Sequence, residues 1–152
     1  MRTLARERDK AEILRRLRTL EPKSARRWER MSAHQMVCHL IDTFSMALGT
    51  KQVSPAAGLR ARTIVKWLAL YVPVAWPPGV QTLPELDQER SGRPPAVFAA
   101  DIAELEALIE LISSKRDRFD CPAHPIFGSM SEVAWLRWGY VHSDHHLRQF
   151  GV

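Results

Sequence analysis

Two histidines near the end of the chain, His142 and His146, are four residues apart. In an α-helix, residues with this spacing lie on adjacent turns of one face, with Cβ atoms about 5–6 Å apart. Their imidazoles could therefore bind one metal ion at about 2.0–2.1 Å each. A complete site needs a third ligand, and His39 is the upstream candidate. The spacing alone leaves three other histidines open as ligands: His34, His124 and His145.

The segment around this pair predicts the helix that would position it. Ser131 and Glu132 open the predicted helix, which runs to Phe150 and ends at Gly151. On a wheel of about 100° per residue, the face of His142 and His146 also holds His145, Trp135, Trp138, Gly139 and Gln149. The opposite side holds Arg137, Asp144 and Arg148. We therefore expect the histidines to point inward, where buried imidazoles need polar partners or a metal, and Gly139 to leave space beside them.

Apolar residues recur at helical spacing in four further segments, and no segment alternates with a period of two. The predicted helices cover residues 3–20, 32–48, 59–71, 95–118 and 131–150. Ser32, with Gln35 three residues later, predicts a capping box. The segment 59–71 is apolar nearly all round, so it should be buried or pack on a neighbour, such as a second copy in a homodimer.

The segment 73–95 is rich in proline, and we expect a long extended connection that covers a site or acts as a lid. Together the elements predict an all-α fold: a four-helix bundle with a short extra helix and a long Pro-rich connection. Residues 1–152 are expected to form a single domain.

Composition excludes several classes of protein. The 152 residues are 45% hydrophobic and 26% charged, as in ordinary globular domains. The net charge of +5 comes largely from arginines in the first thirty residues. Acidic residues are interleaved there, which favours a solvated face over a nucleic-acid interface. No apolar run is long enough to span a membrane, and the absence of a secretory signal predicts a cytoplasmic location.

The two cysteines, Cys38 and Cys121, do not form a CxxC motif, and we expect both to be unreactive structural thiols in a reducing compartment. Asp42 and Glu132 could accept a hydrogen bond from a ligand histidine, although a surface position is the more common outcome for a carboxylate. An aromatic pocket is one possible role, and core packing the more common one, for Trp67, Trp76, Trp135 and Trp138.

Four motifs carry a family resemblance over nearly the whole chain. They are Trp28 with residues 31–40, residues 77–85, residues 124–128, and the segment 135–151 with its Tyr-Val-His-Ser-Asp-His-His core. The sequence resembles an uncharacterised branch of the DinB/YfiT-like superfamily of four-helix bundles. The resemblance implies one divalent metal held by a histidine of the second helix and an HxxxH of the last, which here are His39, His142 and His146. Zinc, nickel and ferrous iron all suit three imidazoles.

One motif departs from that superfamily, which usually has His-Arg-Gly-Gln where this chain has His146-Leu147-Arg148-Gln149. The departure lies beside the expected ligands and affects the substrate pocket.

Three histidines with an open fourth position are typical of a catalytic metal site. The resemblance implies a transferase in which the metal activates a low-molecular-weight thiol, such as bacillithiol or mycothiol, toward a small-molecule electrophile. Metal-dependent hydrolysis is the second hypothesis, and a noncatalytic, metal-free bundle the third. Nucleic-acid binding by the first helix is the least expected function.

Overall fold

The structure of the chain is a computed structural model that describes residues 1–56, 62–72, 74–80, 82–114 and 122–152. The helices in these ranges are α1 (Glu7–Leu17), α2 (Ala33–Ala47), α3 (Arg62–Tyr71), α4 (Phe98–Ser114), α5 (Glu132–Gln149) and a short 3₁₀ turn, η1 (Pro84–Leu86). The same ranges hold no strand, only an isolated bridge between His124 and Gly128. The all-helical prediction is therefore confirmed for the described part of the chain.

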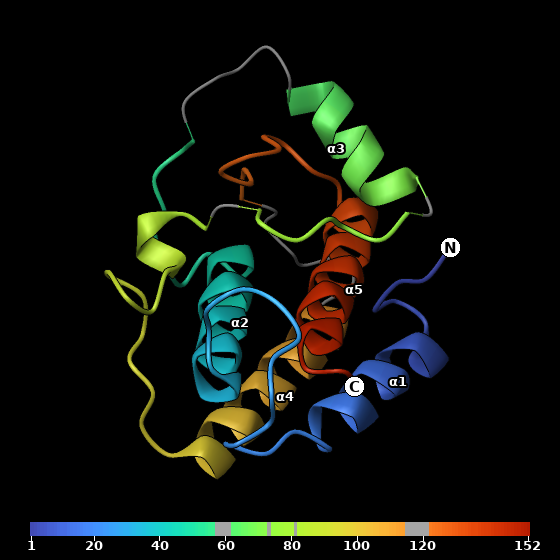
Figure 1. Cartoon of the computed structure of the whole chain (residues 1–152). Coiled ribbons are helices and arrows are strands. Elements are labelled where there is room, and N and C mark those ends of the chain that lie inside the picture. The colour runs from blue at the N-terminus through green and yellow to red at the C-terminus, as the bar shows by residue number, and fades with distance from the viewer. Residues whose placement is uncertain (57–61, 73, 81, 115–121) are drawn as a thin grey trace.

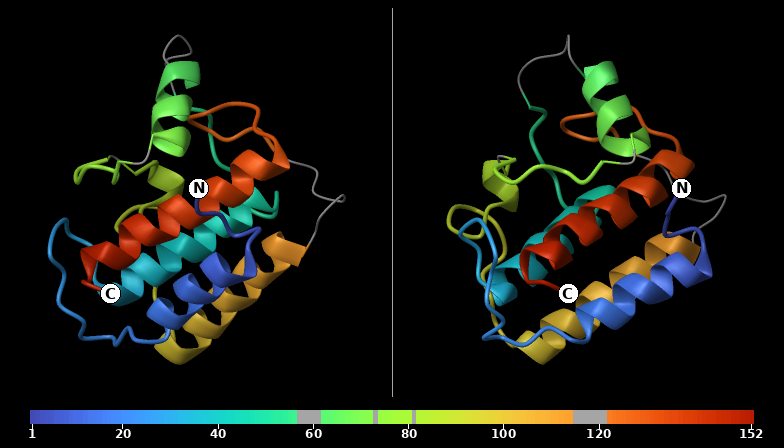
Figure 2. Two further views of the ribbon diagram at one scale, coloured as in Figure 1. Left: turned by 90° about the vertical axis from the view of Figure 1, so that its right-hand side faces the viewer. Right: turned by 45° about the vertical axis from the view of Figure 1, so that its right-hand side comes forward.

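Helices α1, α2, α4 and α5 lie side by side (Figures 1 and 2). Helix α3 lies outside this group, at one end of it, where it packs on α5. Helix α2 packs on α4 and α5, and α1 packs on α5 and α4. The apolar faces meet between these helices, where side chains such as Leu17, Phe44, Leu105 and Trp135 are fully buried. Burial of those faces is the main contribution that holds the helices together.

Both ends of α2 follow from its sequence. The backbone N–H of Gln35 donates to Ser32 Oγ at 3.1 Å, and the N–H of Ser32 donates to Gln35 Oε1 at 2.8 Å. The predicted capping box is therefore confirmed. The helix ends where Gly49 takes a left-handed φ of 77°. These ends fix the helical register, and so the direction in which His39 points.

Helix α5 begins at the predicted cap, because Ser131 Oγ accepts the N–H of Ala134 at 3.3 Å. The expectation that Arg137 faces away from the interior is wrong: its side chain is buried and donates to the carbonyl oxygens of Leu70 and Arg2. The N-terminal segment and the end of α3 cover the side of α5 that a helical wheel assigns to solvent.

Gly139 does not leave space at the site, contrary to the expectation from its position on the wheel. A Cβ added there would lie 2.7 Å from Leu4 Cδ1 and 3.2 Å from Phe44 Cε1. The glycine instead allows close approach of the N-terminal segment and α2 to α5.

Helix α3 is less buried than its composition predicts. Ile64 is 68% exposed and Trp67 58% exposed, while Leu70 is fully buried. Of the two expected arrangements, burial and packing on a neighbour, the chain shows the second, because α3 packs on α5. The first residues of the predicted helix, 59–61, lie outside the described residues.

The other predicted helices are shorter in the structure. Helix α1 covers Glu7–Leu17, and α4 ends at Ser114; the predicted remainder to residue 118 lies outside the described residues. The Pro-rich connection is not extended throughout, since it contains η1 and a turn after it. No described helix combines the length and the apolar character needed to cross a bilayer.

Candidate metal centre

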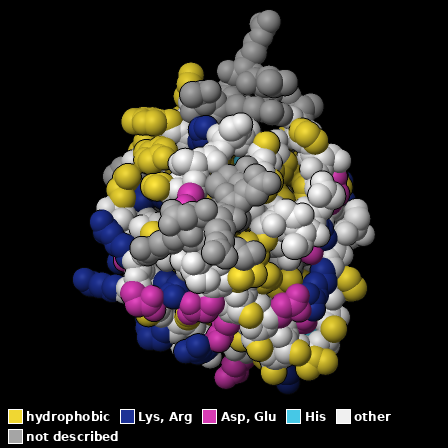
Figure 3. All heavy atoms as spheres, turned by 180° about the vertical axis from the view of Figure 1, so that it is seen from behind, with side chains coloured by type: hydrophobic (Ala, Val, Ile, Leu, Met, Phe, Trp, Pro, Cys, Tyr) yellow, Lys and Arg dark blue, Asp and Glu magenta, His cyan; other side chains and the backbone are white. Residues whose placement is uncertain are grey.

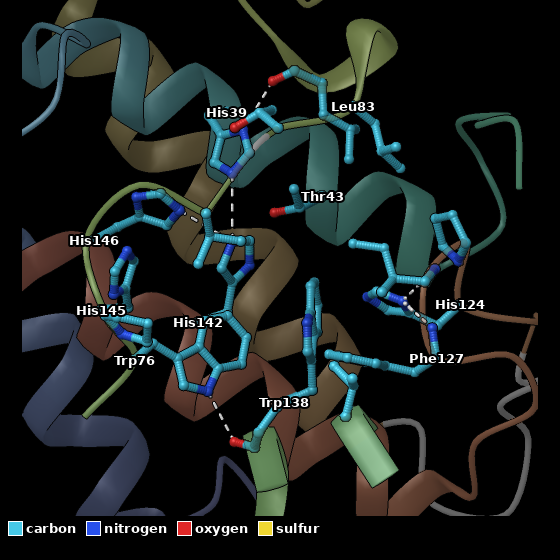
Figure 4. Close-up of a pocket in the computed structure, with 18 of the residues that line it drawn as sticks. His39, Thr43, Trp76, Leu83, His124, Phe127, Trp138, His142, His145 and His146 are labelled. Atoms are coloured by element: carbon cyan, nitrogen blue, oxygen red, sulfur yellow. Dashed lines mark hydrogen bonds between the residues drawn. The ribbon is translucent and has the colours of Figure 1, made fainter. Parts of the chain in front are cut away.

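Helices α2 and α5 bring His39, His142 and His146 together, with their imidazoles turned toward one another (Figure 4). His142 Nε2 lies 3.3 Å from His39 Nε2 and 3.0 Å from His146 Nε2. All three side chains are buried. Two nitrogens bound tetrahedrally to one ion at about 2.0–2.1 Å stand about 3.3 Å apart. The two distances therefore match those between ligands of a common metal ion.

Hydrogen bonds at the other ring nitrogens determine two of the tautomers. His39 Nδ1 donates to the carbonyl oxygen of Leu86 at 2.8 Å, and His146 Nδ1 donates to Gln149 Oε1 at 2.7 Å. The amide of Gln149 is oriented in turn, because its Nε2 donates to the carboxylate of Glu29. With Nδ1 protonated in both rings, His39 Nε2 and His146 Nε2 each present a lone pair to the centre.

His142 faces both of these lone pairs. If its Nε2 carried the proton, it could donate to only one of the two nitrogens. If its Nδ1 carried the proton, a buried N–H would have no acceptor among the described residues, and three lone pairs would converge. Either tautomer is costly without a cation at the common point. The donor set therefore fits a metal ion.

A proton is a poor substitute for that cation. Burial lowers the pKa of His39, and it lowers the pKa values of His142 and His146 still further, where the neighbouring histidines add to the effect. The three imidazoles are therefore neutral at physiological pH, which is the form that binds a metal.

The three alternative histidines take other positions. His145 is buried beside His146, with ring centroids 5.2 Å apart, but its ring does not join the converging nitrogens. His124 lies in the loop before α5, at the far end of the site (Figure 4). His34 points to a separate cluster on α4.

The predicted acceptors for the ligand histidines are not the observed ones. Asp42 is buried, so a surface position is wrong as well, and its carboxylate bonds to Lys51, Gln88 and the backbone N–H of Arg93. Glu132 is half-buried in the first turn of α5. Gln88 and Arg93 belong to the connection before α4, far from Asp42 in sequence, so a local sequence pattern does not predict these bonds.

The observed acceptors are the carbonyl of Leu86, in η1, and the amide of Gln149. Sequence reasoning had placed Gln149 on the face of His146 without assigning it a role, although an i, i+3 pair on a helix can interact. Glu29, which orients Gln149, was missed. Its backbone has φ 63°, uncommon for a residue other than glycine, and its side chain also accepts the N–H of Gly79 at 2.9 Å.

A cavity of about 580 Å³ opens beside the three histidines. Its walls come from α2, α3, α5, the Pro-rich connection and the loop before α5. The three histidines lie at one end, and His124 and Phe127 at the other (Figure 4). Most of the lining is apolar, including Met46, Val65, Leu68, Ala69, Val72, Val74, Val80, Leu83, Ile126 and Trp138.

Two tryptophans flank the ring of His142. Its centroid lies 4.7 Å from that of Trp138 and 5.8 Å from that of Trp76. Trp76 is held in place because its indole N–H donates to the carbonyl of Ala69 at 2.8 Å. Both tryptophans line the cavity, whereas Trp135 is a core residue and Trp67 is exposed. Trp76 and Trp138 therefore have the pocket role, and Trp135 the core role, that the sequence left open.

His124 is a buried, neutral member of the lining. Its Nδ1 accepts the backbone N–H groups of Ile126 and Phe127 at 3.1 and 3.2 Å, so the ring proton is on Nε2. Burial lowers the pKa of His124 to about 3.

A second polar cluster joins α2 to α4. The carboxylate of Asp101 bonds to His34 Nε2 at 2.6 Å and to the guanidinium of Arg93 at 2.8 Å, and Cys38 Sγ lies 3.8 Å away. Arg93 already supplies the positive charge that a metal would bring. Burial, followed by the charge of Asp101, raises the pKa of Cys38 to about 11, so this thiol is unreactive as predicted. Cys121 lies outside the described residues.

The comparisons with known proteins give one match. The model of a family described as "Protein of unknown function (DUF1569)" matches residues 4–151. No curated protein and no solved structure matches the chain. Because the family model covers nearly the whole sequence, the chain belongs to the DUF1569 family.

Proposed function

We propose that this protein is a metal-dependent enzyme with the four-helix-bundle fold of the DinB/YfiT-like superfamily. In this proposal α1, α2, α4 and α5 are the bundle helices and α3 is the extra helix. The arrangement of four neighbouring helices supports the assignment, as does the pairing of one histidine from α2 with two from α5. The ligands are His39, His142 and His146, and the ion is zinc, nickel or iron.

The observation that carries the proposal is the convergence of three neutral Nε2 atoms at the end of a cavity. Three protein ligands leave further coordination positions for a substrate or a nucleophile. A metal ion bound here would lower the pKa of a coordinated water or thiol and so supply a nucleophile at neutral pH.

The surrounding residues have two roles in this proposal. Leu86 and Gln149 orient His39 and His146 and keep their Nε2 atoms unprotonated. Trp76 and Trp138 cover the ring of His142 and exclude water from one side of the centre.

The first candidate reaction is transfer of a low-molecular-weight thiol to an electrophile. A second, more polar cavity of about 740 Å³ supports it, because it shares Glu29, Val80, Thr82, Leu83 and Ile126 with the first cavity. Arg30 and Arg90 also line this polar cavity, where they pair with Glu89 and Asp87. It could hold the hydrophilic body of a thiol whose sulfur reaches the centre.

The second candidate reaction is hydrolysis. The described lining of the first cavity has no lysine or arginine to pair with the carboxylates of glutathione or bacillithiol beside the histidines. Water as the nucleophile would need no such partner.

A panel of electrophiles and esters separates the two reactions. The metal-loaded protein is assayed with no thiol and with bacillithiol, mycothiol or glutathione, and metal-stripped protein is the control. The S-transferase proposal expects turnover only with both metal and thiol, and unchanged turnover in a Cys38→Ser, Cys121→Ser variant. Ester cleavage without thiol would favour the hydrolase, and metal binding without turnover would favour a noncatalytic bundle.

A further inference from the structure

We infer that the first cavity binds a neutral, largely apolar substrate with a flat or aromatic part, and that it discriminates against anions. This inference rests on the proposed function, since it assigns a substrate class to the same centre. It is drawn from the lining of the cavity.

The walls offer mainly apolar and aromatic contacts. Aliphatic side chains come from α3 and from the connection after it, and the rings of Trp76, Phe127 and Trp138 add flat surfaces. The volume of about 580 Å³ lies within the range of about 300–1,000 Å³ usual for small-molecule sites. Each methylene group buried there would tighten binding about fourfold.

The charges around the cavity disfavour an anion. Among the described lining residues, Glu29 is the one that carries a charge, because the histidines are neutral, and its carboxylate lies toward the histidine end through its bond to Gln149. Nearby cations are engaged elsewhere. Lys66 Nζ donates to the carbonyl of Ser129 at 2.9 Å, and the guanidinium of Arg137 donates to backbone carbonyls. An anionic group held between the walls would therefore lose its hydration without gaining a positively charged side chain as a partner.

The neutral ring of His124 also disfavours an anion. His124 keeps its proton on Nε2 and, with its pKa near 3, does not become a cation at physiological pH. It lies at the opposite end of the cavity from the three converging histidines (Figure 4). The cavity therefore has a polar group at each end and apolar walls between them.

Two fluorescent probes with the same skeleton test the inference. N-phenyl-1-naphthylamine is neutral, and 8-anilino-1-naphthalenesulfonate is the same molecule with an added sulfonate. Both are titrated into metal-free and zinc-loaded full-length protein. We expect metal-free protein to bind the neutral probe at least about tenfold more tightly than the sulfonate, because the sulfonate must be desolvated without a cation partner. In the zinc-loaded form the difference should be smaller, because the ion adds a positive charge at the histidine end.

A pair of substitutions on α3 separates the cavity from the exposed apolar surface of the same helix. Val65 lines the cavity and Ile64 does not, although both are exposed. Val65→Lys should tighten sulfonate binding about fivefold or more and weaken binding of the neutral probe, because it places a cation at the cavity wall. Ile64→Lys, the matched control, should leave both affinities within about twofold of wild type, since Ile64 lies outside the lining of the cavity.

Equal affinity of metal-free protein for the two probes would overturn the inference, and so would equal shifts in the two lysine variants. Because the probes are also measured on metal-free protein, the result does not depend on catalysis. Absence of metal binding, with the probe preference intact, would contradict the proposed function and leave the inference about the cavity standing.

Discussion

At the scale of single residues, the candidate centre depends on which ring nitrogen of each histidine carries the proton. Two imidazoles are protonated at Nδ1 because a backbone carbonyl and an amide oxygen accept there, which leaves their Nε2 atoms facing His142. The buried Nδ1 of His142 has no partner among the described residues. A cation at the centre removes the conflict between these groups, so occupancy by metal should also stabilise the fold.

The first prediction is that one divalent metal binds per chain and that His142→Ala or His146→Ala abolishes its binding. Gln149→Leu should weaken it about 10–100-fold, because His146 then loses the acceptor that orients it. Elemental analysis of tag-free protein and competition with a chelator measure both effects. The control is His145→Gln, a buried neighbour outside the converging trio. Unchanged metal content in the alanine variants would contradict the site.

A second prediction concerns pH and His124. Its pKa of about 3 in the folded chain is below the value of about 6.5 for an exposed histidine. As pH falls below about 6.5, the unfolded chain takes up a proton that the folded chain does not, so stability decreases toward pH 3. From pH 7 to pH 5 the loss due to this residue should be about 2 kcal/mol.

Denaturant unfolding of metal-free protein at pH 7 and pH 5 measures that loss. His124→Gln retains an acceptor for the N–H groups of Ile126 and Phe127 but does not titrate. Its stability should therefore fall less than that of wild type over the same interval. Equal losses in the two proteins would show that the folded chain binds the proton as readily as the unfolded chain.

At the scale of elements, the site depends on how closely α5 approaches α2 and the N-terminal segment. Gly139 makes that approach possible, since a Cβ there would lie 2.7 Å from Leu4 Cδ1. Leu4 is itself buried, and its N–H donates to the carbonyl of Leu136 at 3.1 Å, so it has little freedom to move. The packing of this face therefore determines how far α5, with His142 and His146, lies from His39 on α2.

The third prediction follows from this contact. Gly139→Ala should destabilise the protein by about 1–2 kcal/mol, because overpacking of the contact outweighs the better helix propensity of alanine. Chemical denaturation measures the change. In the Gly139→Ala background, Leu4→Ala should cost less than in wild type, since the smaller side chain relieves the overlap. Strictly additive costs would show that the two positions do not compete for space.

At the scale of the whole molecule, charge and apolar surface are separated. Basic and acidic side chains are interspersed over the lower half of the face in Figure 3, and apolar side chains gather at its upper left, where α3 lies. Several N-terminal basic residues have acidic partners, as Lys10 has in Glu110 and Arg18 in Glu106. Such pairing reduces the charge that is available to a polyanion.

The fourth prediction is that the exposed apolar side of α3 forms a homodimer contact. Sedimentation velocity should show a dimer that dissociates on dilution, and Trp67→Lys should shift the equilibrium to monomer, because it places a charge in the buried contact. Val133→Lys, at an exposed apolar position on α5, is the control. A monomeric wild type at high concentration would contradict the prediction.

Local chemistry was sufficient to predict much of this protein from its sequence. The capping box at Ser32, the left-handed Gly49 after α2 and the Ser131 cap of α5 were all predictable, because each depends on residues a few positions apart. Periodicity likewise predicted the helices and the inward direction of His142 and His146. The spacing of those two histidines predicted a shared site.

Only the tertiary structure decided which residues surround that pair. A helical wheel left His39, His34, His145 and His124 open as partners, and the packing of α2 on α5 places His39 against His142. The partners of the ligands also come from distant segments: η1 supplies the carbonyl of Leu86, and Glu29 orients Gln149. Sequence periodicity reports which face of a helix is apolar, but not which segment covers it. For the same reason it placed Arg137 in solvent, which was wrong, and left open which segment α3 packs on.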